Sequence, residues 1–266
     1  MSALILLAIG VHDLLRAVTR DRALSGARLW LLLSLAVALA AAGGGLTSST
    51  LAGAGEGAGP GEGAHGWVWF VVSAVVALGV AVVWHRLDDP REAAARTRGA
   101  RSRLVLLAEV GLLAGLEASL PVVGAALAPP WLAAVAAGVA LVSTANLVTR
   151  DVLELAGRPS SQDEAAPGLR GGRFIGPMER LLMAALGLVG AFPVVAALMA
   201  AKGIVRFPEI SRAGATPASG TSEAAADVDG GAAGGMAEEF LVGSLASWTL
   251  AAGGALLVYA SLLGHP

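Results

Sequence analysis

Two acids in an apolar segment are the residues whose type and spacing point most directly to chemistry. Glu109 and Glu117 lie within the run from Leu104 to Leu127, and Glu117 falls about 20 Å along a helix that begins at Leu104, at a rise of about 1.5 Å per residue. Pro121 follows Glu117 by four residues and cannot donate a hydrogen bond to its carbonyl. A carboxyl group and an unpaired carbonyl would then share one helical turn, an arrangement that can bind a cation or a proton.

The same residues also allow a structural interpretation. An ionisable side chain at the centre of a bilayer costs about 2.5–3.5 kcal/mol, and this cost favours a protonated Glu117 that hydrogen-bonds a neighbouring helix. Glu109 would then only approach the headgroups, and Asn146 would make a hydrogen bond between helices. The intramembrane polar site therefore consists of Glu109, Glu117, Pro121 and Asn146, with an ion-binding role and a structural role both open.

Other chemistry-bearing residues are few. His12 and Asp13 are adjacent, and side chains of adjacent residues on a helix diverge by about 100°, so we expect that they do not form a ligand pair. The chain has no Cys and only four His, and it contains no HExxH, Walker A or GxSxG motif. We therefore expect no metal, no cofactor and no catalytic residue, and the sequence assigns no enzyme activity.

The composition indicates the environment in which these residues must be positioned. Of the 266 residues, 56% are hydrophobic and 14% are charged, against roughly 25% charged residues in a typical soluble domain. The net charge of −2 excludes a basic nucleic-acid-binding protein. A lipid bilayer is the partner that this composition favours, and the excess of Ala, Gly and Arg over Lys is typical of a GC-rich bacterial genome.

We therefore expect an all-α, polytopic transmembrane bundle of about seven helices. A span needs about 20 apolar residues, and the first candidate ends in polar residues, so the bundle would have six spans if that helix lies at the interface. The expected spans are residues 3–18, 29–46, 67–84, 104–127, 131–148, 181–201 and 240–263. Flexible loops are expected at residues 43–66, 158–169 and 213–237.

The basic residues predict an orientation. Three connections on one side of an alternating arrangement carry 15 of the 18 basic residues, and Lys202, Arg206 and Arg212 lie on the other side. The positive-inside rule makes the arginine-rich side cytoplasmic, which predicts a multi-pass protein of the bacterial cytoplasmic membrane with a cytoplasmic C-terminus and, if the first helix spans, an outer N-terminus. The arginines expected to contact anionic lipid or a protein partner are Arg96, Arg98, Arg101 and Arg103.

The C-terminal third carries the most specific pattern in the chain. It reads GRFIGPMER from residue 172, AAKGIVRFPEI from residue 200 and EEFLVGSLASW from residue 238. This pattern resembles the C-terminal signature of a family of uncharacterised bacterial integral-membrane proteins, a domain of unknown function. The resemblance covers about residues 146–255, with Gly203 and Ser244 departing from the expected serine and threonine. It implies a multi-pass membrane protein and supplies no activity.

The resemblance also marks a set of motif residues. They are Arg173, Gly176, Glu179, Arg180, Lys202, Arg206, Glu239 and Gly243. On one continuous helix Glu179 and Lys202 would lie about 35 Å apart and could not pair. We expect instead that Lys202 or Arg206 meets one of the acids at positions 238 and 239, or that these charges are solvated anchors at the interface.

Two hypotheses of function follow. The first is a membrane binding or scaffolding protein whose arginine-rich cytoplasmic side contacts anionic lipid or a partner. The alternative is a small transporter or channel that uses Glu117 beside the helix break at Pro121.

Overall fold

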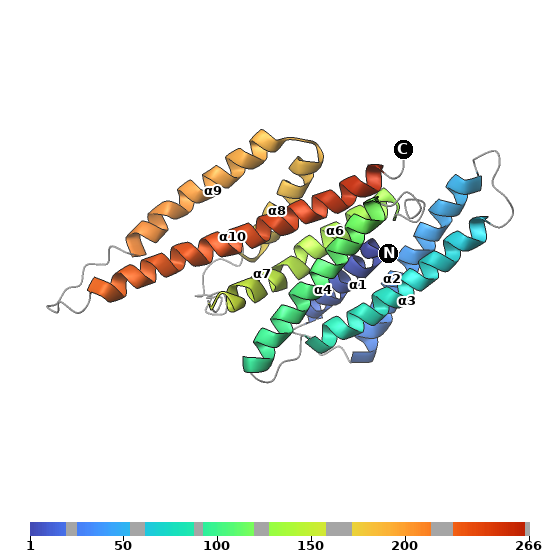
Figure 1. The fold of residues 1–266 in the computed structure, drawn as a ribbon, viewed down its shortest axis with the longest axis horizontal. Helices are drawn as coiled ribbons and strands as arrows, with labels where there is room; N and C mark the ends of the chain where they lie inside the picture. Colours follow the sequence, from blue (N-terminus) through green and yellow to red (C-terminus); the bar gives the residue numbers. More distant parts are fainter. Residues whose placement is uncertain are drawn as a thin grey trace.

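The fold is all-helical in the part of the chain that the structure describes. The computed structural model describes residues 1–19, 26–53, 62–87, 93–119, 128–157, 172–213 and 226–263. Its helices are α1 (Ser2–Thr19), α2 (Gly26–Gly53), α3 (Glu62–Leu87), α4 (Ala93–Ser119), α6 (Pro130–Val142), α7 (Thr144–Leu155), α8 (Gly172–Leu188), α9 (Phe192–Ala213) and α10 (Ala226–Leu263). They form an elongated bundle (Figure 1), and the prediction of an all-α fold is confirmed.

Helix α1 is the centre of the bundle. Its side chains at Ala8 and Ile9 are completely buried, and it packs against α2, α3 and α6. Gly10 allows the closest of these contacts, because a Cβ atom there would lie 3.1 Å from the backbone nitrogen of Ala140. The segment 3–18 is therefore a core helix of this bundle and not a helix laid against its outside.

The segment predicted as one span over residues 131–148 is two helices. Helices α6 and α7 meet at Ser143 with a bend of 48°. The Oγ atom of Ser143 lies 2.7 Å from the carbonyl oxygen of Val139 and 2.8 Å from that of Gly10. A side-chain hydroxyl that competes for carbonyl groups of the preceding turn is a recognised cause of helix bending.

The prediction of one continuous helix over residues 181–201 is wrong. Helix α8 ends at Leu188, and Gly190 has a φ of +72°, the left-handed conformation that glycine adopts without a Cβ penalty. The amide of Ala191 donates to the carbonyl of Leu186 at 2.9 Å, which caps the helix. Pro193 then stands in the first turn of α9, where its missing amide hydrogen costs nothing. The apolar run is continuous, but its Gly–Ala–Phe–Pro sequence turns the chain back.

This turn changes the relation between the two ends of the chain. Helices α1 and α6 run in the same direction, and α10 runs against α6, with Gly254 beside Leu141. Ser2 and Leu263 therefore lie at the same end of the bundle (Figure 1), whereas a seven-span arrangement would put them at opposite ends. The opposite end, at which α1, α3 and α7 finish, is called the arginine end below.

Two predicted loops are largely helical. Helix α2 continues to Gly53 and α3 begins at Glu62, so only residues 54–61 of the predicted loop 43–66 lie outside the described residues. Helix α10 begins at Ala226, within the predicted loop 213–237. Alanine, which has the highest intrinsic helix propensity, is abundant in residues 213–237. Residues 43–66 are instead rich in glycine, and their helical parts continue the apolar runs of α2 and α3. The predicted loop 158–169 lies outside the described residues.

The number of continuous spans is lower than predicted. Among the described residues, two stretches are long and apolar enough to cross a membrane, Phe70–Leu87 and Glu238–Leu263, and the bent pair α6–α7 would make a third. The apolar stretches Leu29–Gly43 and Phe192–Val205 are shorter. Seven uninterrupted spans are therefore not confirmed. The outer faces are nevertheless apolar, with Leu31 68% exposed and Ile204 72% exposed.

Candidate functional site

Polar side chains inside the bundle gather on both faces of α7. Residues 144 and 151 are seven apart in the chain, which places them about 20° apart around a helix, whereas residues 146 and 149 lie on the other side. The N-terminal cluster on the first face consists of His12, Asp13, Trp84, His85, Arg103, Thr144 and Asp151. The C-terminal cluster on the second face consists of Asn146, Thr149, Glu179, Arg180, Lys202, Ser247 and Trp248.

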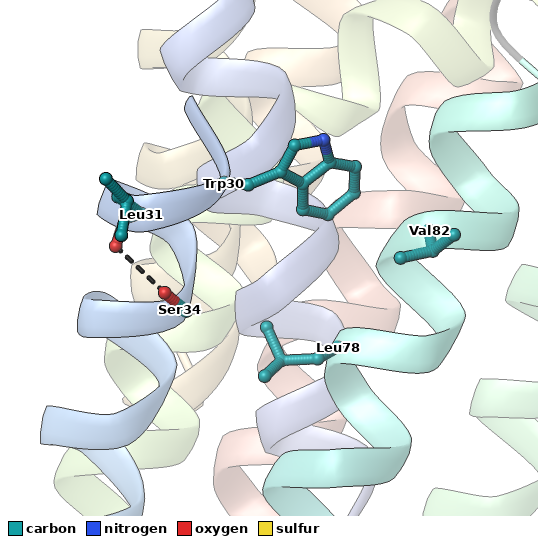
Figure 2. Close-up of a pocket in the computed structure, with 5 residues that line it drawn as sticks. All are labelled: Trp30, Leu31, Ser34, Leu78 and Val82. Carbon is teal, nitrogen blue, oxygen red and sulfur yellow. Dashed lines mark hydrogen bonds between the residues drawn. The ribbon is translucent and has the colours of Figure 1, made fainter. Parts of the chain in front are cut away.

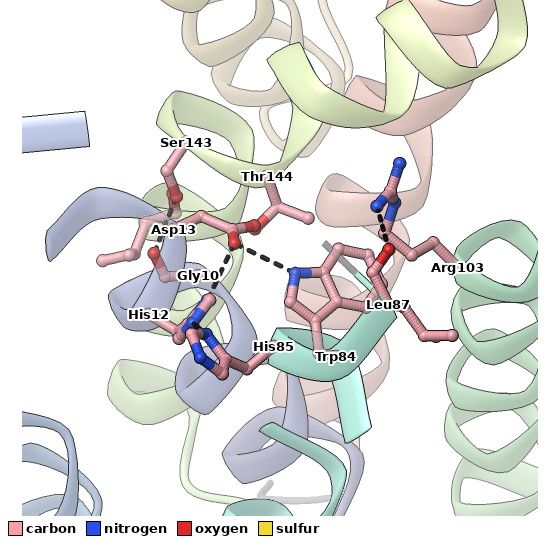
Figure 3. A network of polar contacts seen from close by, with 10 residues as sticks. Gly10, His12, Asp13, Trp84, His85, Leu87, Arg103, Ser143 and Thr144 are labelled. Atoms are coloured by element: carbon pink, nitrogen blue, oxygen red, sulfur yellow. Dashed lines mark hydrogen bonds and ion pairs between the residues drawn. The ribbon is translucent and has the colours of Figure 1, made fainter. Parts of the chain in front are cut away.

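Asp13 is the hub of the N-terminal cluster. Its Oδ1 atom accepts hydrogen bonds from Trp84 Nε1 at 2.9 Å and from His12 Nδ1 at 3.1 Å, and its Oδ2 atom accepts one from Thr144 Oγ1 at 2.8 Å. These donors come from α3, α1 and α7 (Figure 3). The Asp13 carboxylate therefore joins three helices as the common acceptor of their donors.

His12 is joined to a second histidine. Its Nε2 atom lies 3.0 Å from His85 Nδ1 on α3, and the two rings meet edge to face at 78°. His12 and Asp13, which were not expected to form a ligand pair, are joined by a hydrogen bond. The angle of about 100° separates their Cβ atoms, but the imidazole is long enough for its Nδ1 atom to reach back to the neighbouring carboxylate.

Arg103 and Asp151 complete this cluster with a bidentate ion pair. Arg103 Nε donates to Asp151 Oδ2 at 2.7 Å, and Nη2 donates to Oδ1. Arg103 Nη1 also donates to the carbonyl of Leu87 at 2.9 Å. The side chains of Arg103 and Asp151 are both buried, so Arg103 is not available at the surface as predicted. Arg98 and Arg101 are exposed, and the Arg96 side chain lies outside the described residues.

The C-terminal cluster buries an arginine among neutral groups. Arg180 is 4% exposed and donates from Nε to Ser247 Oγ at 2.8 Å, from Nη1 to Asn146 Oδ1 at 2.6 Å and from Nη2 to Thr149 Oγ1 at 3.3 Å. Desolvation lowers the pKa of Arg180 and the neighbouring Glu179 opposes this shift, but a guanidinium keeps its proton in proteins. Arg180 therefore carries its charge with no carboxylate of the described residues in hydrogen-bond contact.

Lys202 is brought to Glu179 by the return of α9. The Nζ atom of Lys202 lies 2.8 and 2.7 Å from the two carboxylate oxygens of Glu179, so the prediction that they cannot pair is wrong. The same atom lies 6.0 Å from the centre of the Trp248 ring. Trp248 Nε1 is buried and has no hydrogen-bond partner in the described part of the chain.

Glu117 lies away from both clusters, towards the end of the bundle that holds Ser2. It is 6% exposed, and its carboxylate accepts hydrogen bonds from the backbone amide of Ser2 at 3.2 Å and from its hydroxyl at 2.5 Å. The amino group of Met1 is 2.9 Å from Oε1. Glu109 is exposed on α4, and Pro121 lies outside the described residues. The structure thus joins Glu117 to α1 and does not join it to Glu109 or to Asn146.

The remaining motif residues are spread over the C-terminal helices. Gly243 faces α7, where a Cβ atom would lie 3.8 Å from Leu153 Cδ1. Gly176 lies in α8, and Glu239 is half-buried in α10. The side chains of Arg173 and Arg206 lie outside the described residues. Of this set, Glu179, Arg180 and Lys202 meet in one place.

Sequence reasoning missed several residues of the clusters. His85, Trp84 and Asp151 lie near the ends of predicted spans, and the sequence assigned them to no site. The spacing of the polar residues on α7 was the available signal, because pairs at seven and three residues mark two faces of one helix.

An apolar groove opens beside the N-terminal cluster. It has a volume of about 410 Å³ and is lined by Trp30, Leu31, Ser34, Leu78 and Val82, between α2 and α3 (Figure 2). The Trp30 ring also lies 6.1 Å from the His12 ring and 5.4 Å from the His85 ring, centre to centre. Trp30 therefore separates the histidine pair from the groove.

No group of three or more His, Cys, Asp or Glu side chains that could hold a metal ion occurs among the described residues. Comparison with known proteins adds no assignment, because no protein-family model, no curated protein and no solved structure matches this chain.

Proposed function

We propose that this chain is a multi-pass protein of the bacterial cytoplasmic membrane that binds anionic lipid headgroups at its arginine end and acts there as a scaffold. The apolar outer faces of the helices support a bilayer as the surrounding solvent. The resemblance of the C-terminal third to an uncharacterised membrane family supports the same class of protein. The buried side chains of Asp13, Arg103, Asp151 and Arg180 are hydrogen-bonded to groups of neighbouring helices, as expected of a rigid body that presents a surface.

The observation that carries this proposal is the return of α9. It brings Lys202 level with Glu179, so Lys202 lies on the same side of the Ser143 bend as the described arginine side chains. A one-sided distribution of basic residues is the signature of the cytoplasmic face. We therefore propose that the arginine end faces the cytoplasm and that Ser2 and Leu263 both face outward, which replaces the expected cytoplasmic C-terminus.

The absence of cysteine from the sequence makes this orientation simple to test. Leu263→Cys and Arg101→Cys place single thiols at exposed positions at the two ends of the bundle. We expect a membrane-impermeant maleimide to label Leu263→Cys on spheroplasts and to label Arg101→Cys only after permeabilisation. The reverse pattern would overturn the orientation, and with it the headgroup site.

Lipid binding is tested at the exposed arginines of α4. Each basic side chain near an anionic membrane surface contributes about 1 kcal/mol, so Arg98→Gln combined with Arg101→Gln should weaken phosphatidylglycerol binding about 30-fold. Native mass spectrometry of the detergent-purified chain at graded lipid concentrations measures this. Glu109→Gln, which changes an exposed charge on the same helix, is the matched control. Arg103 is left unchanged because it is buried against Asp151.

Two outcomes would contradict lipid binding. The first is unchanged lipid affinity in the double variant. The second is unchanged lipid affinity together with the loss of a co-purifying protein, which would assign the exposed arginines to a protein partner.

The second candidate function is a small transporter or channel that uses Glu117. The observation that favours it is a buried carboxyl group on a helix that is otherwise apolar beyond Arg103 and Glu109. Its hydrogen bonds from Ser2 favour a structural role. Proton or ion flux into proteoliposomes should fall in Glu117→Gln if this function is correct, and unchanged or absent flux would remove it.

A further inference from the structure

We propose that the apolar groove between α2 and α3 binds one acyl chain of an anionic phospholipid whose headgroup lies at Arg86. This site is separate from the exposed arginines of α4. It rests on the proposed function only in that the arginine end lies at the level of the lipid headgroups. The observations that carry it are the depth of the groove, its lining and the charge beside it (Figure 2).

The groove lies in the half of a candidate span that ends at the arginine end. Its α3 side is formed by Leu78 and Val82, within the stretch Phe70–Leu87 that is long and apolar enough to cross a membrane. At a rise of about 1.5 Å per residue, Val82 lies about 8 Å and Leu78 about 14 Å from Leu87 along the helix. The hydrocarbon core is about 30 Å thick, so the groove is at the depth of the acyl chains of one leaflet.

The lining of the groove suits a hydrocarbon chain. Four of the five lining residues are hydrophobic, and the hydroxyl of the fifth, Ser34, donates to the carbonyl of Leu31 at 3.0 Å. A polar ligand would lose its hydrogen bonds to water on entering such a place, whereas an acyl chain has none to lose. The volume of about 410 Å³ is within the range of sites that hold small molecules.

The groove is open on its outer side and closed on its inner side. Leu31 is 68% exposed and Val82 is 42% exposed, so its edges continue the apolar outer face of the bundle. On the inner side the Trp30 ring stands in front of the His12 and His85 rings. An acyl chain can therefore enter from the bilayer without reaching the N-terminal cluster.

Arg86 supplies a charge at the end of the groove that lies nearest the membrane surface. It follows Val82 by four residues, so the two side chains are neighbours on one face of α3, and both are exposed. A guanidinium binds phosphate oxygens through parallel hydrogen bonds. A lipid with a net negative charge is favoured, because a zwitterionic headgroup brings its own cation to the same place. The Trp30 ring, at the level of His85, is of the type that prefers the headgroup layer.

Photo-crosslinking of the full chain in nanodiscs tests the groove. The probe is phosphatidylglycerol with a diazirine in the middle of one acyl chain, at a low mole fraction in phosphatidylcholine. We expect the crosslinked residues, identified by mass spectrometry, to concentrate on the residues of α2 and α3 that line the groove. Even labelling of all exposed apolar faces would overturn the proposal, because it is the pattern of lipid that only surrounds the chain.

Val82→Trp and Val83→Trp form a matched pair of variants. The two valines are 42% and 49% exposed, but of the two only Val82 lines the groove, since adjacent side chains diverge by about 100°. We expect Val82→Trp to fill the groove and abolish the crosslinks at Ser34 and Leu78, and Val83→Trp to leave them unchanged. Equal labelling of the two variants would contradict a site in the groove.

Arg86→Gln tests the position of the headgroup. Competition against the probe by unlabelled phosphatidylglycerol should weaken about fivefold, the contribution of one basic side chain near an anionic surface. Competition by phosphatidylcholine should not change. Equal effects on the two lipids would remove the headgroup from Arg86.

The α4 arginines separate this proposal from the proposed function. Arg98→Gln combined with Arg101→Gln should leave the labelling of the groove unchanged, and a fall in labelling would contradict the separation of the two sites. If groove labelling persists while this double variant does not weaken lipid binding, the site on α4 fails and the groove stands. If the unchanged chain shows no groove labelling, the groove fails whatever the double variant does. Crosslinks between two copies of the chain at the groove, lost in Val82→Trp, would assign it to a second copy instead of a lipid.

Discussion

The two clusters on either side of α7 hold buried cations in opposite ways. In the N-terminal cluster Arg103 faces a carboxylate with which it makes two hydrogen bonds. In the C-terminal cluster Arg180 faces two hydroxyls and an amide, while the nearby carboxylate of Glu179 is taken by Lys202. The buried arginine on one face of the helix is thus paired with a carboxylate, and among the described residues the buried arginine on the other face is not.

The difference teaches what each arginine does for stability. Removing one member of a buried ion pair strands a charge in a place that cannot solvate it, which is more costly than leaving neutral groups unpaired. Arg103 and Arg180 are buried to a similar extent, but replacing them should therefore lower the free energy of unfolding by different amounts.

The largest expected effect comes from breaking the buried ion pair of Arg103 and Asp151. Arg103→Met keeps the side-chain volume and leaves the Asp151 carboxylate buried without its partner. We expect a loss of about 3–5 kcal/mol in the free energy of unfolding, measured by urea titration in mixed micelles. Combining it with Asp151→Leu, which removes the stranded charge, should restore most of the loss. A loss below about 1 kcal/mol would contradict the assignment of this pair as a buried one.

The corresponding change on the other face should cost less. Arg180→Met removes a charge that has no carboxylate partner among the described residues. It takes one donor from each of Ser247 Oγ, Asn146 Oδ1 and Thr149 Oγ1, while Asn146 and Thr149 keep their hydrogen bonds to backbone carbonyls. We expect a loss of about 1–3 kcal/mol by the same titration. A loss equal to that of Arg103→Met would break the comparison, because it would mean that the neutral acceptors hold the cation as strongly as a carboxylate does.

The turn that returns α9 to the C-terminal cluster is expected to be sensitive to a side chain. Gly190→Ala places a Cβ at a φ of +72°, which costs about 1–2 kcal/mol. Gly203→Ala is the matched control, because a Cβ there meets no atom within 4 Å and alanine stabilises a helix by up to about 1 kcal/mol over glycine. Opposite signs in the two unfolding titrations are expected, and equal signs would contradict the position of the turn.

The smallest expected effect is on the pair that α9 completes. Lys202→Met leaves Glu179 without its partner, but the lysine side chain is 28% exposed, so solvent screens the pair. We expect a loss of about 0.5–1 kcal/mol. Limited proteolysis should respond more strongly than the free energy of unfolding, and the rate of cleavage within α9 should increase. Protection of α9 equal to that of the unchanged chain would show that its apolar contacts alone hold it.

The sequence predicted the helical class and the positions of α3 and the apolar part of α10, because continuous apolar runs determine both. It did not predict the turn at Gly190, because the apolar segment 181–201 is long enough to indicate a span although it contains Gly190 and Pro193. The pairing of Glu179 with Lys202 depends on that turn and was excluded for the same reason.

The N-terminal cluster could not be predicted from the sequence for another reason. His12 and Asp13 were present in the sequence as a pair, but their partners His85 and Trp84 lie more than 70 residues away, and periodicity within one helix says nothing about which helices meet. Conversely, the acid that the sequence emphasised, Glu117, holds the start of α1 and joins neither cluster.

Helix α7 is only 12 residues long, and side chains on its two faces are fastened to α1 and α4 on one side and to α8 and α10 on the other. Helix α7 therefore cannot rotate about its own axis without disturbing the hydrogen bonds on both of its faces. A displacement of Thr144 by Asp13 would therefore also move Asn146 and Thr149, on the opposite face, where they hold Arg180.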